Sequence, residues 1–285
     1  MVRLIALDID GTLLDSRWQV LPANADAIRR ATDAGIEVAL VTGRRFDFAR
    51  PVIEQVDAPL TMIVSGGALV KTRDGETLVR HLLPLDVARA VVEGTIDFRD
   101  ATAIVFDRPR AAQIVHERLD IRDAHRRSYF QQNRDFIVEV VPLESALTED
   151  PIQVMFSGGV QRMRELVARV RSLDVAPDVA VAITEYESRD FALVDVNRAG
   201  CTKGTTLAEW AAGRGLTPDQ VMAVGDNFND REMLEYAGVP VVMGNAVPEL
   251  KQLGWPMTSD NDSGGVAAAI HRYALADRDG GRSPA

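Results

Sequence analysis

The fold of this chain is decided by residues 4–14, which read LIALDIDGTLL. The first four are apolar, which is typical of a β-strand buried on both faces, as in a parallel sheet. Asp8 and Asp10 follow directly, and Gly11 begins a turn. If the strand alternation continues, both carboxylates project to one side and repel each other unless a cation or a proton lies between them. The stretch alone leaves two readings open: an ordinary turn, or a metal site or catalytic acid pair.

Length and composition limit the function classes. The chain has 285 residues, 46% hydrophobic and 26% charged, which allows one large domain or two unequal ones. Its net charge of −10 argues against an extended nucleic-acid surface but still allows a small anionic ligand at a local site. A single cysteine, the lack of a signal-peptide pattern and the lack of long apolar runs predict a cytoplasmic protein without a membrane partner. The oligomeric state is left open between a monomer and a small homo-oligomer.

Strand and helix patterns alternate in two separate parts of the chain. Short apolar strands are predicted at 36–41, 60–64, 221–224 and 239–243, with helical spacing between them. This alternation predicts a doubly wound parallel α/β sheet. In the segment between these two parts, from about residue 83 to residue 189, helices and strands no longer alternate one for one, which indicates an inserted α+β module. We therefore predict a core formed by 1–82 and 190–285, and an inserted domain at 83–189.

Four of the predicted strands end in small polar clusters. In open α/β sheets ligands bind beyond the carboxyl ends of the strands, so clusters far apart in the sequence should meet at one edge. The clusters are Asp8 and Asp10, Thr42 and Gly43, Asp226 with Asn229 and Asp230, and Gly244 with Asn245.

The residue types in these clusters indicate phosphoryl-transfer chemistry. Asp8, Asp10 and Asp226 offer the hard oxygen ligands that Mg²⁺ prefers. Thr42 offers a hydroxyl, and Lys203 supplies a positive charge. The P-loop string, the dinucleotide-binding glycine motif and the Gly-x-Ser-x-Gly elbow are all missing from the sequence. Asp8 is therefore the natural nucleophile, because a carboxylate can attack phosphorus and form an acyl phosphate.

The motifs in their order resemble those of the haloacid dehalogenase (HAD) superfamily. They are Asp8-Ile9-Asp10-Gly11-Thr12-Leu13, Thr42-Gly43-Arg44, Lys203 and Gly225-Asp226-x-x-Asn229-Asp230. Gly244-Asn245-Ala246 and the long insert are similar to the Cof-type subfamily of capped phosphatases. The resemblance implies a Rossmann-like core with an inserted C2-type cap, and a phosphoric monoester hydrolase that uses Mg²⁺ and acts on a small phosphorylated metabolite such as a sugar phosphate.

The resemblance also implies a role for each matching residue. Asp8 would be the nucleophile and a Mg²⁺ ligand, and Asp10 the general acid and base that also binds Mg²⁺ through its carbonyl. Asp226 would be the third ligand, with Asp230 supporting it from behind. The transferring phosphate would be held by Ile9, Thr42, Gly43, Lys203 and Asn229, and Arg44 would contact the substrate or the cap.

Some features leave alternatives open. Ser65 stands where many relatives have asparagine, which puts any contact of that asparagine in doubt. The basic stretch formed by Arg122, His125, Arg126 and Arg127 is interpreted as a solvated helix face. A sugar phosphomutase that uses the same aspartyl phosphate is the alternative enzyme, and a non-catalytic module that binds phosphorylated metabolites is the alternative outside enzymes.

Overall fold

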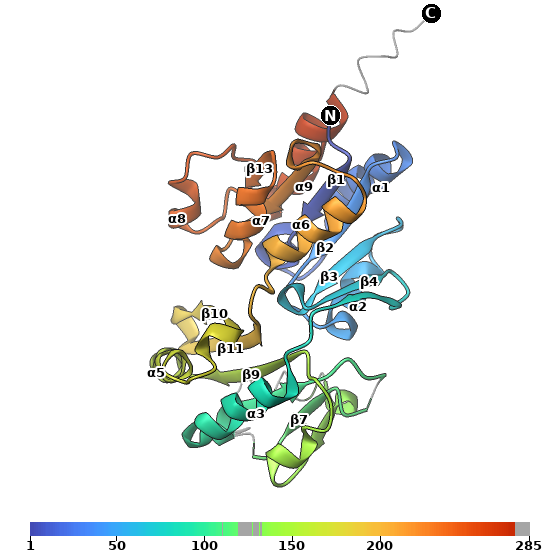
Figure 1. Cartoon of the computed structure of the whole chain (residues 1–285). Helices are drawn as coiled ribbons and strands as arrows, with labels where there is room; N and C mark the ends of the chain where they lie inside the picture. Colours follow the sequence, from blue (N-terminus) through green and yellow to red (C-terminus); the bar gives the residue numbers. More distant parts are fainter. Residues whose placement is uncertain (110, 119–126, 128–130, 132, 277–285) are drawn as a thin grey trace, which may run out of the picture. The chain divides into compact units, whose positions relative to one another are not determined.

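The chain divides into two units. The core unit consists of Met1–Arg80 and Thr202–Ala285, and the inserted unit of His81–Cys201. The structure, a computed structural model, describes residues 1–276 with the exception of 110, 119–126, 128–130 and 132 (Figure 1). The two units are described separately below.

The core unit is built on a sheet of seven strands in the order β13-β12-β1-β2-β3-β4-β5. The five strands from β13 to β3 are parallel, and β4 and β5 extend the sheet as an antiparallel hairpin. The strands are β1 (Leu4–Leu7), β2 (Glu37–Val41), β3 (Thr61–Val64), β4 (Leu69–Thr72), β5 (Thr77–Arg80), β12 (Val221–Gly225) and β13 (Val239–Val242). All four residues of β1 are fully buried, because the strand lies at the centre of a sheet covered on both faces.

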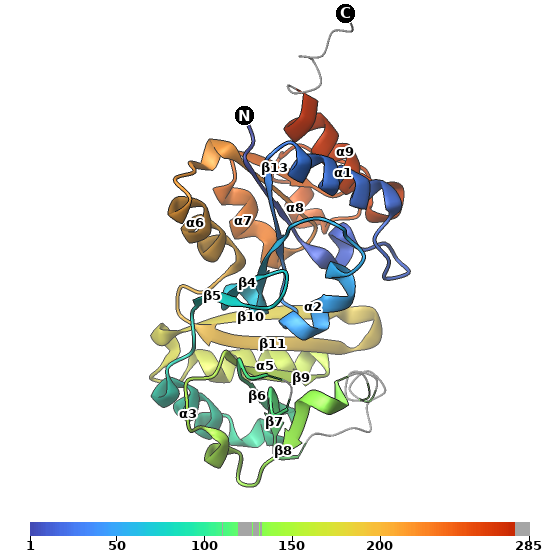
Figure 2. The same ribbon diagram turned by 90° about the vertical axis from the view of Figure 1, so that its right-hand side faces the viewer.

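Helices cover both faces of this sheet, with α1 beside α9 and α6 beside α7 (Figure 2). The helices are α1 (Pro22–Asp33), α2 (Phe46–Ile53), α6 (Lys203–Gly213), α7 (Arg231–Tyr236), α8 (Pro248–Lys251) and α9 (Gly265–Ile270). Helix α1 begins at a proline, whose fixed φ suits the first helical position, and buries Ala27, Ile28 and Ala31. Helix α6 begins with a capping box in which Thr202 and Thr205 bond reciprocally to each other's backbone N–H groups.

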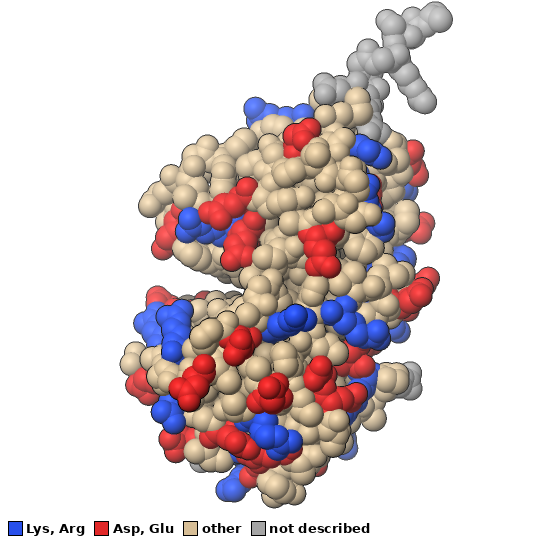
Figure 3. Space-filling view, viewed as in Figure 1, with Lys and Arg blue, Asp and Glu red and all other residues tan. Residues whose placement is uncertain are grey.

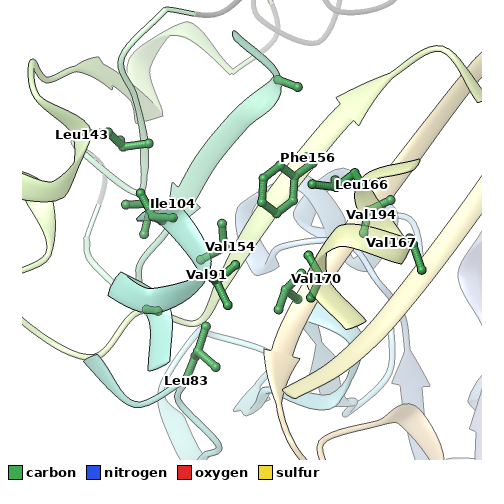
Figure 4. Close-up of a cluster of buried hydrophobic side chains, with 14 of the residues drawn as sticks. Leu83, Val91, Ile104, Leu143, Val154, Phe156, Leu166, Val167, Val170 and Val194 are labelled. Carbon is green, nitrogen blue, oxygen red and sulfur yellow. The ribbon is translucent and has the colours of Figure 1, made fainter. Parts of the chain in front are cut away.

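The inserted unit has a mixed sheet of six strands in the order β10-β11-β9-β6-β7-β8. Its elements are α3 (Leu85–Gly94), β6 (Thr102–Val105), β7 (Ile114–His116), β8 (Ile137–Glu139), β9 (Gln153–Gly158), α5 (Val160–Arg171), β10 (Val179–Tyr186) and β11 (Phe191–Arg198). Alternate residues of β9 and β11, among them Phe156 and Val194, pack with α3 and α5 in one apolar cluster (Figure 4). The unit thus has its own core, on one face of its sheet.

The predicted fold class, a parallel α/β core with an inserted α+β unit, is confirmed, but the structure places the boundaries differently. The predicted boundary after residue 189 falls within the turn between β10 and β11, which pair along their whole length. Strand β11 also pairs with β9, so 190–201 belong to the inserted unit and not to the core. Strands β4, β5, β7 and β11 were not predicted either, and the first three have only three or four residues each, which is too short to establish a strand pattern.

Two further observations complete the fold. Of the basic stretch, Arg122, His125 and Arg126 lie outside the described residues. Within the described part of the chain, no helix combines the length and the apolar character needed to cross a bilayer.

Candidate active site

The polar clusters meet at one edge of the core sheet. Asp8 follows β1, Thr42 follows β2 and Asp226 follows β12, and these three strands are neighbours in the order β12-β1-β2. Because the strands are parallel, their carboxyl ends lie side by side, and residues separated by up to 218 positions in sequence come together. The convergence expected from the sequence is therefore observed.

Asp8 lies at the centre of the site and is bound by a lysine. Its side chain is almost fully buried, and Nζ of Lys203 lies 2.6 Å from Asp8 Oδ1. The same ammonium group lies 2.7 Å from Oδ1 of Asp230, which has no exposed surface. Lys203 is the first residue of α6, so the capping box beside it fixes the helix from which this side chain reaches the sheet edge.

The charges in this cluster perturb one another. Burial raises the pKa of Asp8, and the nearby charge of Asp230 raises it further, while Lys203 opposes both effects. For Lys203, burial lowers the pKa, but the charges of Asp230 and Asp8 outweigh burial and raise it above the ordinary value. The lysine therefore stays charged. Its single positive charge does not balance the negative charges of Asp8, Asp226 and Asp230 when all three are ionised.

Asp230 organises the loop that follows β12. Its Oδ2 accepts hydrogen bonds from the backbone N–H groups of Asp226 and Asn227, both at 3.0 Å. With Oδ1 bound to Lys203, both oxygens of this carboxylate have partners. Asp230 thus holds the backbone of Asp226 and the side chain of Lys203 in place.

Asp226 is held by the loop that follows β1. Thr12 Oγ1 donates a hydrogen bond of 2.8 Å to Asp226 Oδ1. Gly11 has φ +80, and a Cβ atom there would overlap with the Asp226 carboxylate, so the close approach of this loop requires glycine. Burial raises the pKa of Asp226 to about 7, with a further contribution from the charge of Asp230.

The carboxylates fit a small divalent cation. One carboxylate oxygen each from Asp8, Asp226 and Asp230 lies within 4.8 Å of the others. The donors are oxygens only, which suits Mg²⁺. The raised pKa values of Asp8 and Asp226 mean that Lys203 does not fully offset burial and the charges of the neighbouring carboxylates, and a divalent cation would supply the missing positive charge. Because both oxygens of Asp230 are engaged, Asp8 and Asp226 are the side chains that would hold the ion.

Asp10 is bound by Arg44, for which sequence reasoning expected a contact with the substrate or cap. Nε and Nη2 of Arg44 lie 2.8 and 2.5 Å from the two carboxylate oxygens of Asp10, which forms a bidentate pair. The guanidinium also lies 5.4 Å from the ring centre of Trp18 and 4.9 Å from that of Phe48. Asp10 remains 41% exposed, while Arg44 is 11% exposed. The pair presents a carboxylate to solvent from a fixed position.

The remaining predicted residues line the same edge. Thr42 is buried at the end of β2, and its Oγ1 accepts a hydrogen bond from the N–H of Arg44 at 3.1 Å. Gly43 follows it, and a Cβ atom there would meet nothing within 4 Å. Ile9 lies between the two aspartates with its side chain in the core, so only its backbone can serve a ligand. Asn229 is exposed in the loop that Asp230 organises.

Ser65 occupies a strained, buried position beside these loops. It has φ +53 and is 1% exposed, and its N–H donates to the carbonyl of Arg44 at 2.9 Å. Its hydroxyl has no hydrogen-bond partner among the described residues. Ser65 thus places a buried polar atom without a hydrogen bond at the base of the site.

The structure adds residues that sequence reasoning did not assign a role. Two of them are Gly11 and Thr12, which were described above. The third is Asn245, which bridges two loops: its Nδ2 donates to the Gly11 carbonyl at 2.8 Å, and its Oδ1 accepts from the N–H of Asn261 at 3.0 Å. The position of Asn245 directly after a predicted strand was the signal for it, since all the clusters share that position.

Comparisons with known proteins agree with this architecture. Residues 5–270 match the family of haloacid dehalogenase-like hydrolases. The HMP-PP phosphatase of Serratia proteamaculans is 30% identical over 254 residues, which are 89% of this chain and 88% of that protein. The pyridoxal phosphate phosphatase YbhA of Escherichia coli is 27% identical over 288 residues, 96% of this chain and 99% of that protein.

Solved structures show the same fold. A haloacid dehalogenase-like hydrolase from Bacteroides thetaiotaomicron superposes with a TM-score of 0.80 at 23% identity, covering 95% of this chain and 99% of the other. A phosphatase of the same superfamily and organism has a TM-score of 0.78 at 24% identity and covers 96% of both chains. With the family match spanning nearly the whole chain, the protein belongs to the haloacid dehalogenase-like hydrolases.

Proposed function

We propose that this protein is a Mg²⁺-dependent phosphatase that hydrolyses a small soluble phosphomonoester through an aspartyl phosphate. The observation that carries the proposal is the meeting of Asp8, Asp226 and Lys203 at the carboxyl edge of the sheet, with the two carboxylates close enough to share one ion. Bound Mg²⁺ would neutralise charge on the phosphoryl oxygens.

In the first step the Asp8 carboxylate attacks phosphorus. A bond forms between a carboxylate oxygen and phosphorus while the ester P–O bond breaks, and the protonated Asp10 gives its proton to the leaving oxygen. Lys203 lies against Asp8 and offsets the negative charge there. Thr42 and the backbone of Ile9 and Gly43 orient the phosphoryl group.

In the second step water attacks the acyl phosphate. Asp10, now ionised, takes a proton from the water, and the bond between phosphorus and the Asp8 oxygen breaks. Inorganic phosphate leaves, and both aspartates return to their starting states. Arg44 bears on this second step, in which Asp10 is ionised, because its bidentate pair holds the Asp10 carboxylate in one orientation.

The inserted unit serves as a cap in this proposal. A unit with its own core and sheet can move as one body, exclude water while the acyl phosphate forms and contribute to substrate selection. The core unit supplies the phosphate-handling groups, so discrimination between phosphoesters falls to other side chains.

A small phosphorylated metabolite is the proposed substrate class. Related proteins are named for pyridoxal phosphate and for HMP-PP, which are small phosphorylated compounds. The face of the protein in Figure 3 shows acidic and basic side chains interspersed, and the net charge is −10, which does not favour nucleic acid.

The direct test is release of inorganic phosphate from a generic aryl phosphate with Mg²⁺, for the parent protein and for Asp8→Asn. We expect the variant to lose activity by at least ~10³-fold, as removal of a nucleophile does. Asp33→Asn, an exposed aspartate in α1, is the matched control and should keep the parent rate. Equal rates for the parent and Asp8→Asn would end the proposal, and isomerisation of a sugar phosphate without phosphate release would indicate the mutase instead.

A further inference from the structure

A short hairpin in the core unit, residues 15–19, comes close behind the loop that follows β1, and the proposed chemistry uses none of its side chains. The N–H of Asp15 donates to the carbonyl of Gln19 at 2.9 Å, and the N–H of Trp18 donates to the carbonyl of Asp15 at 3.0 Å. Asp15 Oδ1 also accepts a hydrogen bond of 2.8 Å from the N–H of Gln19. These bonds fix the backbone of the turn on which Trp18 lies.

Trp18 is exposed, and its backbone is strained. Its φ is +63, in the left-handed region that glycine and asparagine adopt readily and bulky residues rarely do. The residue is also 60% exposed, so burial of the indole does little to offset this strain. Backbone outliers of this kind cluster at functional sites. Strain that burial does not offset points to a contact between the indole and a ligand.

The indole lies next to the proposed general acid. The guanidinium of Arg44 is 5.4 Å from the centre of the Trp18 ring, and the same guanidinium forms the bidentate pair with Asp10 at 2.8 and 2.5 Å. In the proposed mechanism Asp10 gives its proton to the leaving oxygen, which requires these two groups to be within hydrogen-bond distance. The organic part of the phosphoester therefore begins beside this pair. All three residues belong to the core unit.

The ring is held in place by the hairpin and by Arg44. The hairpin fixes the backbone of Trp18, and Arg44, which is only 11% exposed, contacts the ring. The same guanidinium lies 4.9 Å from the ring centre of Phe48, so it contacts two aromatic rings. An indole has only two side-chain torsions, so a ligand that contacts it restricts little conformational freedom. Trp18 thus presents a rigid apolar surface beside the leaving group.

We propose that Trp18 is a specificity-determining residue that stacks on a planar aromatic ring in the organic part of the phosphoester. Aromatic rings stack on an indole through their π faces whatever substituents they carry, whereas a polyol or an aliphatic chain has no such face. This inference rests on the proposed phosphatase function and narrows its substrate class.

The test compares two esters that differ in the aromaticity of one ring. Benzyl phosphate and cyclohexylmethyl phosphate have the same carbon skeleton, and each releases a primary alcohol of similar basicity, so the ratio of their kcat/KM values isolates recognition of the flat ring. We expect the parent to prefer benzyl phosphate by at least ~fivefold. Trp18→Leu, which keeps an apolar side chain without a flat ring, should bring the ratio close to one. A parent without this preference would overturn the proposal.

Further variants separate stacking from a structural role. Trp18→Phe keeps a flat ring and should keep a preference of at least ~twofold. Trp18→Gly removes the ring together with the strain at φ +63, so it tests the loss of preference even if the leucine variant folds poorly. The matched control is Trp210→Leu, which should keep the parent ratio, because Trp210 also lies against an arginine, Arg214, but bonds to Glu37 at the start of β2. Equal losses for both esters in Trp18→Leu would mean that the indole only supports the general acid, and would overturn the proposal.

A binding experiment separates this inference from the phosphatase proposal. Benzylphosphonate and cyclohexylmethylphosphonate have no ester bond, so calorimetric titration in the presence of Mg²⁺ measures their binding without turnover. The parent should bind the benzyl compound more tightly by at least ~fivefold, and Trp18→Leu should bind the two alike. If the parent releases no phosphate from any ester but shows this preference, the phosphatase proposal fails and stacking on Trp18 stands. If phosphate is released but neither the kcat/KM ratio nor the Kd ratio depends on Trp18, stacking fails and the phosphatase proposal stands.

Discussion

Gly11 determines how closely the loop after β1 can approach the carboxylate of Asp226. Gly11→Ala would place a methyl group on that carboxylate and also force alanine to φ +80. We expect loss of phosphatase activity by at least ~10²-fold, because a misplaced ligand disturbs both metal and loop. The measurement is kcat/KM with an aryl phosphate.

Gly35→Ala provides the matched control for this change. Gly35 has φ +76, but a Cβ atom there meets nothing within 4 Å. This variant should therefore lose about 1 kcal/mol of stability through backbone strain and keep its activity. Equal activities for the two variants would show that contact with Asp226 is not what requires glycine at position 11.

Arg44 holds the carboxylate of Asp10, the proposed general acid and base, through two hydrogen bonds. Arg44→Gln removes the bidentate pair with Asp10, and we expect kcat to fall by ~10–10²-fold with little change in melting temperature. Arg44→Lys keeps the charge but not the fork, so it should recover only part of the loss. Arg50→Gln, a half-exposed arginine in α2, is the control. Full activity of Arg44→Gln would show that Asp10 needs no such positioning.

Strand β11 contains Asp195, whose buried carboxylate lowers the stability of the folded protein when it is ionised. Its folded pKa of about 7 lies above its ordinary value of 3.8, so the folded state binds more protons between these values and stability falls as pH rises through this window. Asp195→Asn has no carboxyl to ionise at this position, so the part of the stability loss that Asp195 causes between these pH values should disappear. We expect the variant to gain at least ~1 kcal/mol over the parent between pH 4 and pH 8.

Urea unfolding at several pH values measures this gain. Asp174→Asn, an exposed aspartate in the same unit, controls for the loss of a charge as such. A stability difference between the parent and Asp195→Asn that does not change with pH would contradict the assignment of this cost to the Asp195 carboxylate.

The elements also show which parts of the structure can be predicted from sequence. The meeting of Asp8, Thr42 and Asp226 is predictable because each follows a buried parallel strand, and such strands end at one edge. The partner of Arg44 is not predictable, since a long side chain at the same edge can reach several groups. The boundary of the inserted unit is missed because the turn Glu187–Arg189 is polar and exposed like a linker, although strands β10 and β11 continue on both sides of it.

For the whole molecule, the free energy of unfolding should respond to Mg²⁺. Binding at 100 times Kd adds ~2.7 kcal/mol, and chelation removes it. Asp226→Asn should change this response in two ways. Without Mg²⁺ at pH 8 the variant should melt above the parent, because the buried charge of a carboxyl with a pKa of about 7 has been removed. With Mg²⁺ its melting temperature should not rise. Asp33→Asn should behave like the parent in both conditions. A full response to Mg²⁺ in Asp226→Asn would place the ion elsewhere.

The central claim is that Asp8 carries the phosphoryl group between the two chemical steps. The most direct measurement is acid quenching of the Asp10→Asn variant during turnover of ³²P-labelled nitrophenyl phosphate. The nitrophenolate leaving group needs no proton, so the acyl phosphate can form in this variant. It should then accumulate, because no general base activates water to hydrolyse it. We predict that the protein carries the label and that borohydride reduction converts residue 8 to homoserine. The double variant with both Asp10→Asn and Asp8→Asn should carry no label. Label on another residue, or phosphate release without any labelled protein, would contradict the account.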